Sequence, residues 1–472
     1  MALELKAGTK VYFLAICGTG MSALAGLLKE RGCIVAGSDV AAYPPVGDLL
    51  KALQIPVCLS YDVEDLKKFA PDYVVIGNFI RRDNPQAQYV MEKKIPYGSF
   101  PSTLEDYFLQ KTDNFVVVGT HGKTTTTATL SHLLTFAGLD PSFLIGGVPI
   151  NFEKSFHVGR GKDFVMEGDE YDTAFFDKES KFLHYRPTFG LFMSMEFDHA
   201  DIFANSEAME KMFRKFVHLI PKDRGALIYC RDWKRVGELI AEEKLSSKAI
   251  SFGFDPSSTY AIQNYSDNAS GMEFELDGTV YKNSMTGKFN AQNFAAAILA
   301  AREAGVSAKV LAEALQNFKG VKRRQEVRAQ VGKHLVIDDF AHHPTAVREV
   351  LRGLRAKYPQ HKIVVFFEPR SNTSRRKILQ SEFETAFDGA DQTFLAPVFK
   401  EEALPENDRL DISKIKSSHA SRGKSVDGPL SQDEMIAKSL KLASSSPCLF
   451  VVLSNGSFNG LHESLISSLK LQ

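Results

Sequence analysis

A run of small and polar residues after a short apolar stretch is the part of this sequence best suited to chemistry. Residues 116–118 are valines, and they lead into Gly119, Thr120, His121, Gly122, Lys123, Thr124 and Thr125. A glycine turn at a helix start presents backbone N–H groups to anionic oxygens, while a lysine and a hydroxyl can serve terminal phosphates and a magnesium ion. The pattern predicts a phosphate-binding loop, and the alternative is an ordinary strand-to-helix turn.

The spacing of this loop differs from that of the general phosphate-binding motif. That motif places its first glycine five residues before the second, where this chain has Val117. Gly119 stands only three residues before Gly122. The loop therefore departs from the general motif at one position, that of the first glycine.

Two further predicted strands end in acidic loops. Residues 163–166 lead into Glu167, Asp169 and Glu170, and residues 189–194 lead into a loop with Glu196, Asp198 and His199. Ligands of doubly wound sheets bind at the carboxyl ends of strands, and Mg²⁺ prefers oxygen ligands. Glu167 and the Asp198-His199 pair are therefore candidate metal ligands. Alternatively, these acids cap the helices that follow.

An earlier strand-helix-strand unit over residues 10–39 carries a second glycine motif. Its residues fit G-x-G-x-x-A, with Asp39 where a ribose-binding acid is expected, and they are Gly18, Thr19, Gly20, Met21, Ser22 and Ala23. Three interpretations stay open at this point. The unit binds a nicotinamide or flavin, binds another nucleotide such as a nucleotide-sugar, or forms a structural turn.

Other polar groups follow later strands and helices. Asn290 and Asn293 lie one helical turn apart, either as a buried pair or as readers of a base or substrate amide. Basic residues that include Arg324 mark a hinge, and Asp339, His342 and His343 follow a strand that precedes a helix starting at Pro344. The strand at 362–367 ends near Arg370. No third ligand stands at zinc-like spacing from the histidine pair, so a zinc site is not predicted.

The candidate loops follow strands in widely separated parts of the chain, so more than one sheet must position them. We predict an α/β protein of three domains: a Rossmann-like N-terminal domain at 1–109, a central P-loop ATPase-type sheet with a small antiparallel patch at 110–327, and a Rossmann-like C-terminal domain at 328–472. Residues 96–101 are interpreted as a linker because of their prolines and glycine, and a hairpin is predicted to turn at Asp277-Gly278.

Composition restricts the possible partners and location. Lys and Arg total 57, as do Asp and Glu, so the chain has no net field that would favour nucleic acid. Five scattered cysteines without a C-x-x-C pair indicate reduced thiols. The sequence shows neither an apolar leader segment nor an apolar run near 18 residues, so we expect a cytoplasmic, non-membrane protein. Composition gives no signal for an oligomeric state.

Together, these motifs resemble the Mur ligase family of ATP-dependent amide ligases in bacterial cell-wall synthesis, over essentially the whole chain. The family's shortened phosphate loop accounts for the spacing of Gly119 and Gly122. The N-terminal glycine motif is similar to that of members that add L-alanine to UDP-N-acetylmuramate. The segments at 169–178, 196–203 and 368–373 are more similar to members that add L-alanyl-γ-D-glutamyl-meso-diaminopimelate in peptidoglycan recycling.

The resemblance implies a ligation through an acyl phosphate, with ATP and Mg²⁺ as cofactors and with UDP-N-acetylmuramate and a murein tripeptide as substrates. UDP-N-acetylmuramate would then bind at Gly18, Thr19, Gly20, Met21, Ser22 and Asp39, and this displaces the dinucleotide interpretation. The ATP site would comprise Gly119, Thr120, His121, Gly122, Lys123, Thr124, Thr125, Asn293, Arg324 and Asp339.

The resemblance also implies individual roles. Thr124 and Glu167 would hold one Mg²⁺ and His199 a second, while Lys123 would bridge the β- and γ-phosphates. His342 and Arg370 would face the incoming peptide, where an arginine suits a carboxylate.

Two departures from the family pattern limit the comparison. Phe340 stands where the single-amino-acid ligases carry tyrosine, so contacts to the amine substrate cannot be transferred from them. Several members use a carbamylated lysine, and neither Lys211 nor Lys215 matches that position well. The alternatives are the biosynthetic L-alanine ligase, a P-loop hydrolase or kinase, and a UDP-sugar sensor, although the intact Lys123 and Glu167 disfavour a sensor.

Overall fold

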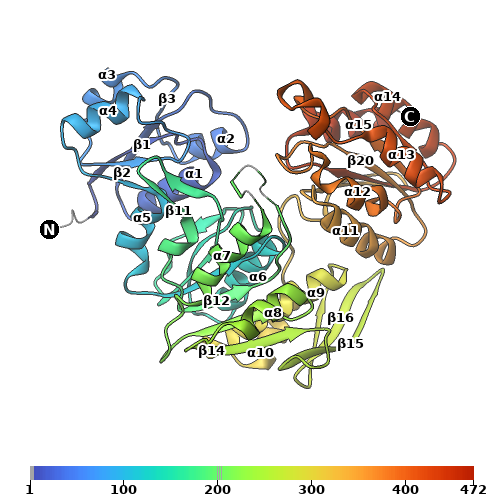
Figure 1. The fold of residues 1–472 in the computed structure, drawn as a ribbon, viewed down its shortest axis with the longest axis horizontal. Helices are drawn as coiled ribbons and strands as arrows, with labels where there is room; N and C mark the ends of the chain where they lie inside the picture. The colour runs from blue at the N-terminus through green and yellow to red at the C-terminus, as the bar shows by residue number, and fades with distance from the viewer. Residues whose placement is uncertain (1–4, 199, 201, 204, 472) are drawn as a thin grey trace.

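The structure is a computed structural model that describes residues 5–198, 200, 202–203 and 205–471. These residues form three large sheets flanked by helices, which follow one another along the chain (Figure 1). The first unit (blue) and the third (orange and red) lie on opposite sides of the upper part of Figure 1, with the central unit (green and yellow) below. The predicted α/β fold is confirmed.

The first unit is a five-stranded parallel sheet in the order β3-β2-β1-β4-β5. Its strands are β1 (Lys10–Leu14), β2 (Ile34–Ser38), β3 (Val57–Cys58), β4 (Tyr73–Ile76) and β5 (Tyr97–Ser99). Its helices are α1 (Thr19–Glu30), α2 (Val46–Ala52), α3 (Val63–Phe69), α4 (Pro85–Glu92) and α5 (Phe100–Leu104), the last continued by a π-helical turn (Glu105–Leu109).

The interpretation of residues 96–101 as a linker was wrong. They form β5 and the start of α5, because Ser99 caps the helix by accepting a hydrogen bond from the Ser102 N–H at 3.2 Å. Pro101 lies in the first turn, where a helix needs no backbone donor. The same residue types that suit a linker therefore also suit a capped helix start.

The central unit is a ten-stranded sheet in the order β17-β16-β15-β14-β13-β12-β6-β9-β7-β8. Its strands are β6 (Asp113–Val118), β7 (Ser142–Leu144), β8 (Phe156–His157), β9 (Asp163–Glu167), β12 (Phe189–Phe192), β13 (Ala226–Cys230), β14 (Lys248–Gly253), β15 (Tyr260–Asn268), β16 (Gly271–Leu276) and β17 (Thr279–Asn283). Its helices are α6 (Lys123–Phe136), α7 (Ser206–Val217), α8 (Lys234–Glu242), α9 (Lys288–Glu303) and α10 (Ala308–Gln316). A separate hairpin comprises β10 (Asp172–Ala174) and β11 (Asp177–Ser180).

The predicted hairpin turn is confirmed. Asp277 (φ 51°) and Gly278 (φ 72°) connect β16 to β17, as a two-residue turn with left-handed central residues requires. This antiparallel patch joins the main sheet through β15, which pairs with β14.

The third unit is a six-stranded sheet in the order β18-β19-β23-β20-β21-β22, with an antiparallel first strand. Its strands are β18 (Glu326–Val331), β19 (His334–Asp339), β20 (Lys362–Phe367), β21 (Gln392–Leu395), β22 (Val426–Asp427) and β23 (Cys448–Leu453). Its helices are α11 (Pro344–Lys357), α12 (Gln380–Ala386), α13 (Ile412–Ala420), α14 (Gln432–Ala443) and α15 (Leu461–Lys470). As predicted, α11 starts at Pro344.

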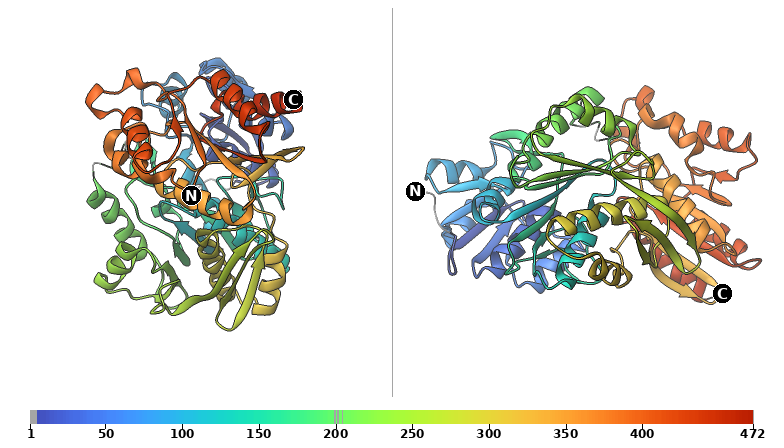
Figure 2. Two further views of the ribbon diagram at one scale, coloured as in Figure 1. Left: turned by 90° about the vertical axis from the view of Figure 1, so that its right-hand side faces the viewer. Right: turned by 90° about the horizontal axis from the view of Figure 1, so that it is seen from below.

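The first and central units share one apolar cluster, whereas the third has two of its own. Gly26 of α1 packs against the Phe156 ring, and a side chain at Gly26 would overlap that ring. The third unit meets the central one through the partly buried Phe289 and through polar contacts, such as the Thr286 hydroxyl donating to the Gly353 carbonyl at 2.8 Å. Figure 2 shows the two end units on opposite sides of the central sheet.

Within the described part of the chain, no helix combines the length and the apolar character needed to cross a lipid bilayer.

Candidate active site

The phosphate loop connects β6 to α6 at the centre of the ten-stranded sheet. Gly119 (φ 122°) and Gly122 (φ 84°) adopt backbone conformations that L-residues rarely take. A Cβ atom at Gly119 would lie 2.6 Å from the Ser194 carbonyl oxygen, and one at Gly122 would overlap the Asn293 amide oxygen. Both glycines are therefore required by conformation and by space, as expected for a loop that approaches a ligand with its backbone.

Lys123 lies at the N-terminus of α6 with its ammonium group fixed by two partners. Its Nζ is 2.8 Å from Glu170 Oε1 and donates to the Gly119 carbonyl at 2.6 Å. Burial acts to lower the pKa of Lys123, but the ion pair with Glu170 outweighs burial and raises the pKa above its usual value. The loop thus carries a permanent positive charge.

Thr124 and Glu167 form a pair of oxygen donors beside the loop. The Thr124 hydroxyl donates to Glu167 Oε2 at 3.1 Å, and Glu167 Oε1 accepts from the Gly146 N–H at 2.5 Å. Burial raises the pKa of Glu167, and the Gly146 N–H and Lys123 oppose this effect. A hydroxyl next to a carboxylate matches the ligand preference of Mg²⁺, so these residues fit the predicted metal.

The linker to the third unit reaches the same point. Arg324 Nη2 donates to the Thr124 hydroxyl at 3.3 Å, and the guanidinium lies 4.9 Å from the centre of the Phe340 ring. Asp339, at the end of β19, accepts from the N–H groups of Gln325 at 2.7 Å and Ala341 at 2.8 Å. The structure therefore brings Arg324 to the phosphate loop and places Asp339 against the linker that carries Arg324. Their roles in binding ATP stay a prediction.

The remaining predicted ATP-site residues pack around the loop. Asn293 Oδ1 accepts from Thr126 at 3.3 Å, and its Nδ2 donates to Asn290 Oδ1 at 3.4 Å. These bonds support the buried-pair interpretation of the two asparagines, and adenine contact by Asn293 stays a prediction. Thr125 is buried in the first turn of α6.

Thr120 and His121 face the loop that follows β12. The Thr120 hydroxyl donates to the Glu196 carbonyl at 2.8 Å, and His121 Nε2 lies 2.6 Å from Glu196 Oε2. Burial raises the pKa of Glu196, but its hydrogen bond to His121 and the charges nearby outweigh that and lower it. This glutamate therefore stays ionised beside the phosphate loop.

The two residues predicted to meet the peptide lie at the carboxyl edge of the third sheet. His342 Nδ1 is 3.0 Å from the Phe340 carbonyl, and its Nε2 is 3.8 Å from Asp198 Oδ2. The Arg370 guanidinium stacks 3.9 Å from the centre of the Phe399 ring and donates to Glu368 at 3.3 Å. The Arg370 fork is thus held in place by neighbouring side chains.

The predicted substrate residues of the first unit form a separate group at the end of β1. Gly18 caps α1, and Thr19, Gly20, Met21 and Ser22 open the helix. Asp39 accepts from the Cys17 N–H at 2.8 Å and the Val40 N–H at 2.7 Å. The structure therefore places Asp39 beside the glycine motif.

Three residues named from the sequence, His199, Lys211 and Lys215, add no contact to the described site. His199, predicted as a metal ligand and catalytic residue, lies outside the described residues. Lys211 and Lys215 form exposed ion pairs with Glu207 and Glu179.

Sequence reasoning missed three residues that the structure adds to this region, namely Glu170, Glu196 and Thr345. The two glutamates were visible as acids at strand ends, but their partners depend on how the loops fold. Thr345 gave no signal, because a threonine in the first turn of a helix is ordinary.

Glu196 also stands near two histidines. Its carboxylate and the imidazoles of His121 and His343 offer atoms within 4.8 Å of one another, a separation that would suit a metal ion. Hydrogen bonds already engage the His121 Nε2, the Glu196 carboxylate and the His343 Nδ1, which accepts from the Thr345 N–H at 3.3 Å. The buried His343 Nε2, in contrast, has no hydrogen-bond partner among the described residues.

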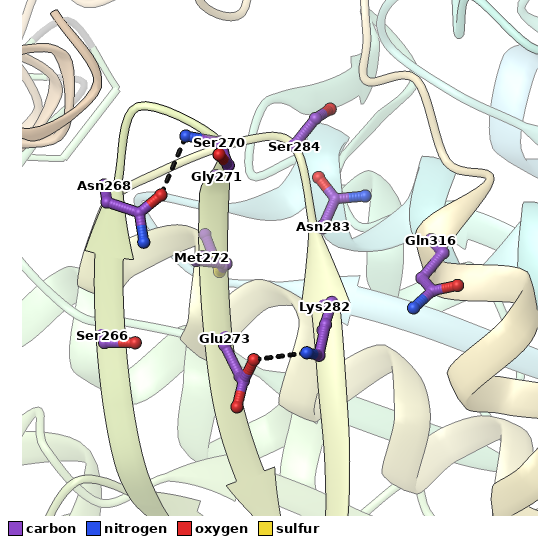
Figure 3. A pocket seen from close by; sticks show the side chains of 10 residues that line it. All are labelled: Ser266, Asn268, Ser270, Gly271, Met272, Glu273, Lys282, Asn283, Ser284 and Gln316. Atoms are coloured by element: carbon purple, nitrogen blue, oxygen red, sulfur yellow. Dashed lines mark hydrogen bonds and ion pairs between the residues drawn. The ribbon is translucent and has the colours of Figure 1, made fainter.

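A shallow hollow of about 350 Å³ lies elsewhere, between the β15–β17 strands and Gln316 (Figure 3). Glu273 and Lys282 are neighbours on β16 and β17 and pair at 2.6 Å, and Asn283 donates to two backbone carbonyls. None of the predicted site residues lines it.

Three family models match the chain in order. They are the Mur ligase family catalytic domain at 10–112, the Mur ligase middle domain at 117–301 and the Mur ligase glutamate ligase domain at 323–457. Together they span all three units.

Similar proteins extend over almost the whole chain. A UDP-N-acetylmuramate–L-alanyl-γ-D-glutamyl-meso-2,6-diaminoheptandioate ligase of Escherichia coli is 36% identical, covering 98% of each chain. A UDP-N-acetylmuramate–L-alanine ligase of Clostridium acetobutylicum is 33% identical over 89% of each. The crystal structure of a murein peptide ligase from Psychrobacter arcticus matches with a TM-score of 0.71 and 32% identity, covering 98% of this chain and 99% of that one. The chain belongs to the Mur ligase family.

Proposed function

We propose that the chain is an ATP-dependent ligase that joins UDP-N-acetylmuramate to L-alanyl-γ-D-glutamyl-meso-diaminopimelate through an acyl phosphate, in peptidoglycan recycling. The observation that carries this proposal is the contact of Arg324, in the linker to the third unit, with the Thr124 hydroxyl, which itself donates to Glu167. The charges of Lys123 and Arg324 both act on Glu167. The whole-chain likeness to a ligase named for that reaction supports the choice of substrates.

In this proposal, ATP supplies the phosphoryl group that activates the muramyl carboxylate. Lys123 and the loop N–H groups bind the phosphates, and Thr124 and Glu167 hold Mg²⁺. Arg324, which already touches Thr124, adds a second positive charge near the transferring group. Positioned cations and dipoles of this kind stabilise charge that develops during the reaction.

The third unit would bind the amine substrate. Arg370 is stacked on Phe399 and paired with Glu368, so its planar fork is ready to bind a peptide carboxylate through two parallel hydrogen bonds. His342 stands at the same edge. We assign UDP-N-acetylmuramate to residues 1–109, ATP to 110–327 and the peptide to 328–472. The five free cysteines favour a reducing, cytoplasmic location.

The test is ligation of UDP-N-acetylmuramate with ATP and Mg²⁺ in the presence of either the tripeptide or L-alanine. Phosphate release and product mass are measured together. We expect a strong preference for the tripeptide. Preference for L-alanine would support the biosynthetic ligase instead, and phosphate release that needs no amine would support a hydrolase or kinase.

A further inference from the structure

Two threonines of the third unit bind one short loop of the central unit. The Thr345 hydroxyl, in the first turn of α11, donates to Glu196 Oε1 at 2.9 Å. The Thr373 hydroxyl, in the loop after β20, donates to Asp198 Oδ1 at 2.6 Å. The two acceptors are two residues apart in the loop that follows β12.

The loop is also attached to the phosphate loop. The Glu196 N–H donates to the Thr120 hydroxyl at 3.0 Å, and Glu196 Oε2 lies 2.6 Å from His121 Nε2. Glu196 Oε2 therefore contacts the phosphate loop and lies 3.5 Å from His343 Nδ1, while Oε1 accepts the hydrogen bond from Thr345. This places the β12 loop between the two units.

The hydrogen bond between Thr373 and Asp198 is buried, which increases its contribution to the placement of the loop. Thr373 is 2% exposed and Asp198 is 6% exposed. A buried carboxylate is unfavourable unless its oxygens accept hydrogen bonds, so the Thr373 hydroxyl stabilises the placement of Asp198. Because β12 ends at Phe192, the strand itself does not fix residues this far along the loop.

We propose that Thr345 and Thr373 are positioning residues, which fix Glu196 and Asp198 of the loop after β12 only when the third unit is docked. The consequence for ligation rests on the proposed function, whereas the consequence for the loop does not. No contact with substrate is assigned to either threonine.

A different contact between the same two units provides a matched control. The Thr286 hydroxyl donates to the Gly353 carbonyl at 2.8 Å, at the opposite end of α11 from Thr345. Thr286→Val removes an inter-unit hydrogen bond without touching the β12 loop. It therefore separates loop positioning from a general loosening of the interface.

The first experiment measures backbone hydrogen exchange of residues 193–198 in the full chain without ligands. In the double variant T345V/T373V we expect about tenfold faster exchange there, since local opening sets the rate. Exchange in β6 should stay unchanged, which shows that the variant is folded. The double variant T345S/T373S should restore slow exchange. Unchanged exchange in T345V/T373V, or an equal rise in T286V, would overturn the proposal.

The second experiment measures steady-state ligation. We expect T345V/T373V to lower kcat about tenfold or more with a much smaller change in KM for UDP-N-acetylmuramate, because the ground-state sugar contacts are untouched. T345S/T373S should recover kcat. Failure of the unmodified chain to ligate either amine would contradict the proposed function, while the exchange experiment would still decide on the two threonines.

Discussion

Among single residues, Lys123 is the side chain on which the proposed chemistry depends most. Its side chain is 16% exposed, and its charged ammonium is held between Glu170 and the Gly119 carbonyl. We expect Lys123→Ala to remove about 3 kcal/mol or more of transition-state stabilisation, because its contact with the phosphates is lost. The ligation rate should therefore fall at least about a hundredfold.

The matched control for this change is Lys211→Ala. Lys211 forms an exposed ion pair with Glu207 on the outside of α7, and such pairs contribute little. Rates of phosphate release and product formation check both variants. Equal activity of the two variants would contradict a role for Lys123 at the phosphates.

His343 gives a prediction for the pH dependence of stability. Burial, with His121 nearby, lowers the pKa of His343 to about 4, below the value of about 6.5 in an unfolded chain. Between these values the unfolded chain binds more protons. The contribution of His343 to stability is therefore complete above about pH 6.5 and is lost as the pH falls towards 4.

The variant His343→Asn isolates this effect, because asparagine does not titrate and still offers an oxygen to cap α11. Urea unfolding of both proteins at pH 7 and pH 4 is the measurement. The unmodified chain should lose about 3 kcal/mol more than the variant over this range. Parallel losses would show that His343 is not buried in its neutral form.

At the residue scale, functional side chains could be predicted from the sequence where their type and position have few structural explanations. Lys123 and Thr124 follow a glycine turn at a strand end, and Asp339 ends a strand in the same way. Glu196 could not be assigned from the sequence, because its partners His121 and Thr345 are 75 and 149 residues away. Only the folded arrangement of two units brings these groups together.

At the scale of elements, the phosphate loop can be tested with a pair of glycines. Gly122 and Gly138 have similar left-handed backbones, with φ of 84° and 80°. A Cβ atom at Gly122 would overlap Asn293 Oδ1, whereas one at Gly138 would meet nothing within 4 Å. Alanine at either position carries the conformational cost of about 1 kcal/mol, and only Gly122→Ala adds a clash in the loop.

We therefore expect Gly138→Ala to lower the free energy of unfolding by about 1 kcal/mol and leave ATP affinity unchanged. Gly122→Ala should lower stability further and weaken ATP binding about tenfold or more, because the loop N–H groups move. Urea unfolding and calorimetric titration with ATP are the measurements. Matching ATP affinities in the two variants would argue against phosphate binding by this loop.

Elements with continuous apolar sequence were predicted well, and short polar ones were not. β20 has the bounds expected from the sequence, since it is a buried apolar run. The strand Tyr97–Ser99 was missed because it has three residues, the first of them exposed, and it exists only through pairing with β4. The sequence pattern alone cannot reveal a strand that depends on its neighbour.

At the scale of the whole molecule, the site is divided between units with different kinds of attachment. The first and central units share an apolar cluster. The linker and the third unit reach the phosphate loop and the loop after β12 through polar side chains, such as Arg324 and Thr345. Hydrogen bonds of this kind are individually weak and can exchange with water. The arrangement therefore lets a ligand at the phosphate loop influence how firmly the third unit is held.

Arg324 allows this coupling to be measured, because it reaches from the linker to the Thr124 hydroxyl while stacking on Phe340. At a free MgATP concentration of 100 times Kd, the chain should gain about 2.7 kcal/mol of stability, and removal of Mg²⁺ with EDTA should reduce this gain. Arg324→Lys tests the linker directly.

This variant keeps the positive charge of Arg324 but loses its planar fork. If it binds MgATP ten times more weakly, the stability gained at the same nucleotide concentration falls to about 1.4 kcal/mol. Arg352→Lys, which alters an exposed pair with Glu349, should keep the full gain. If Arg324→Lys keeps it too, the linker does not take part in nucleotide binding, and the third unit must be coupled to the phosphate loop through the Glu196 contacts instead.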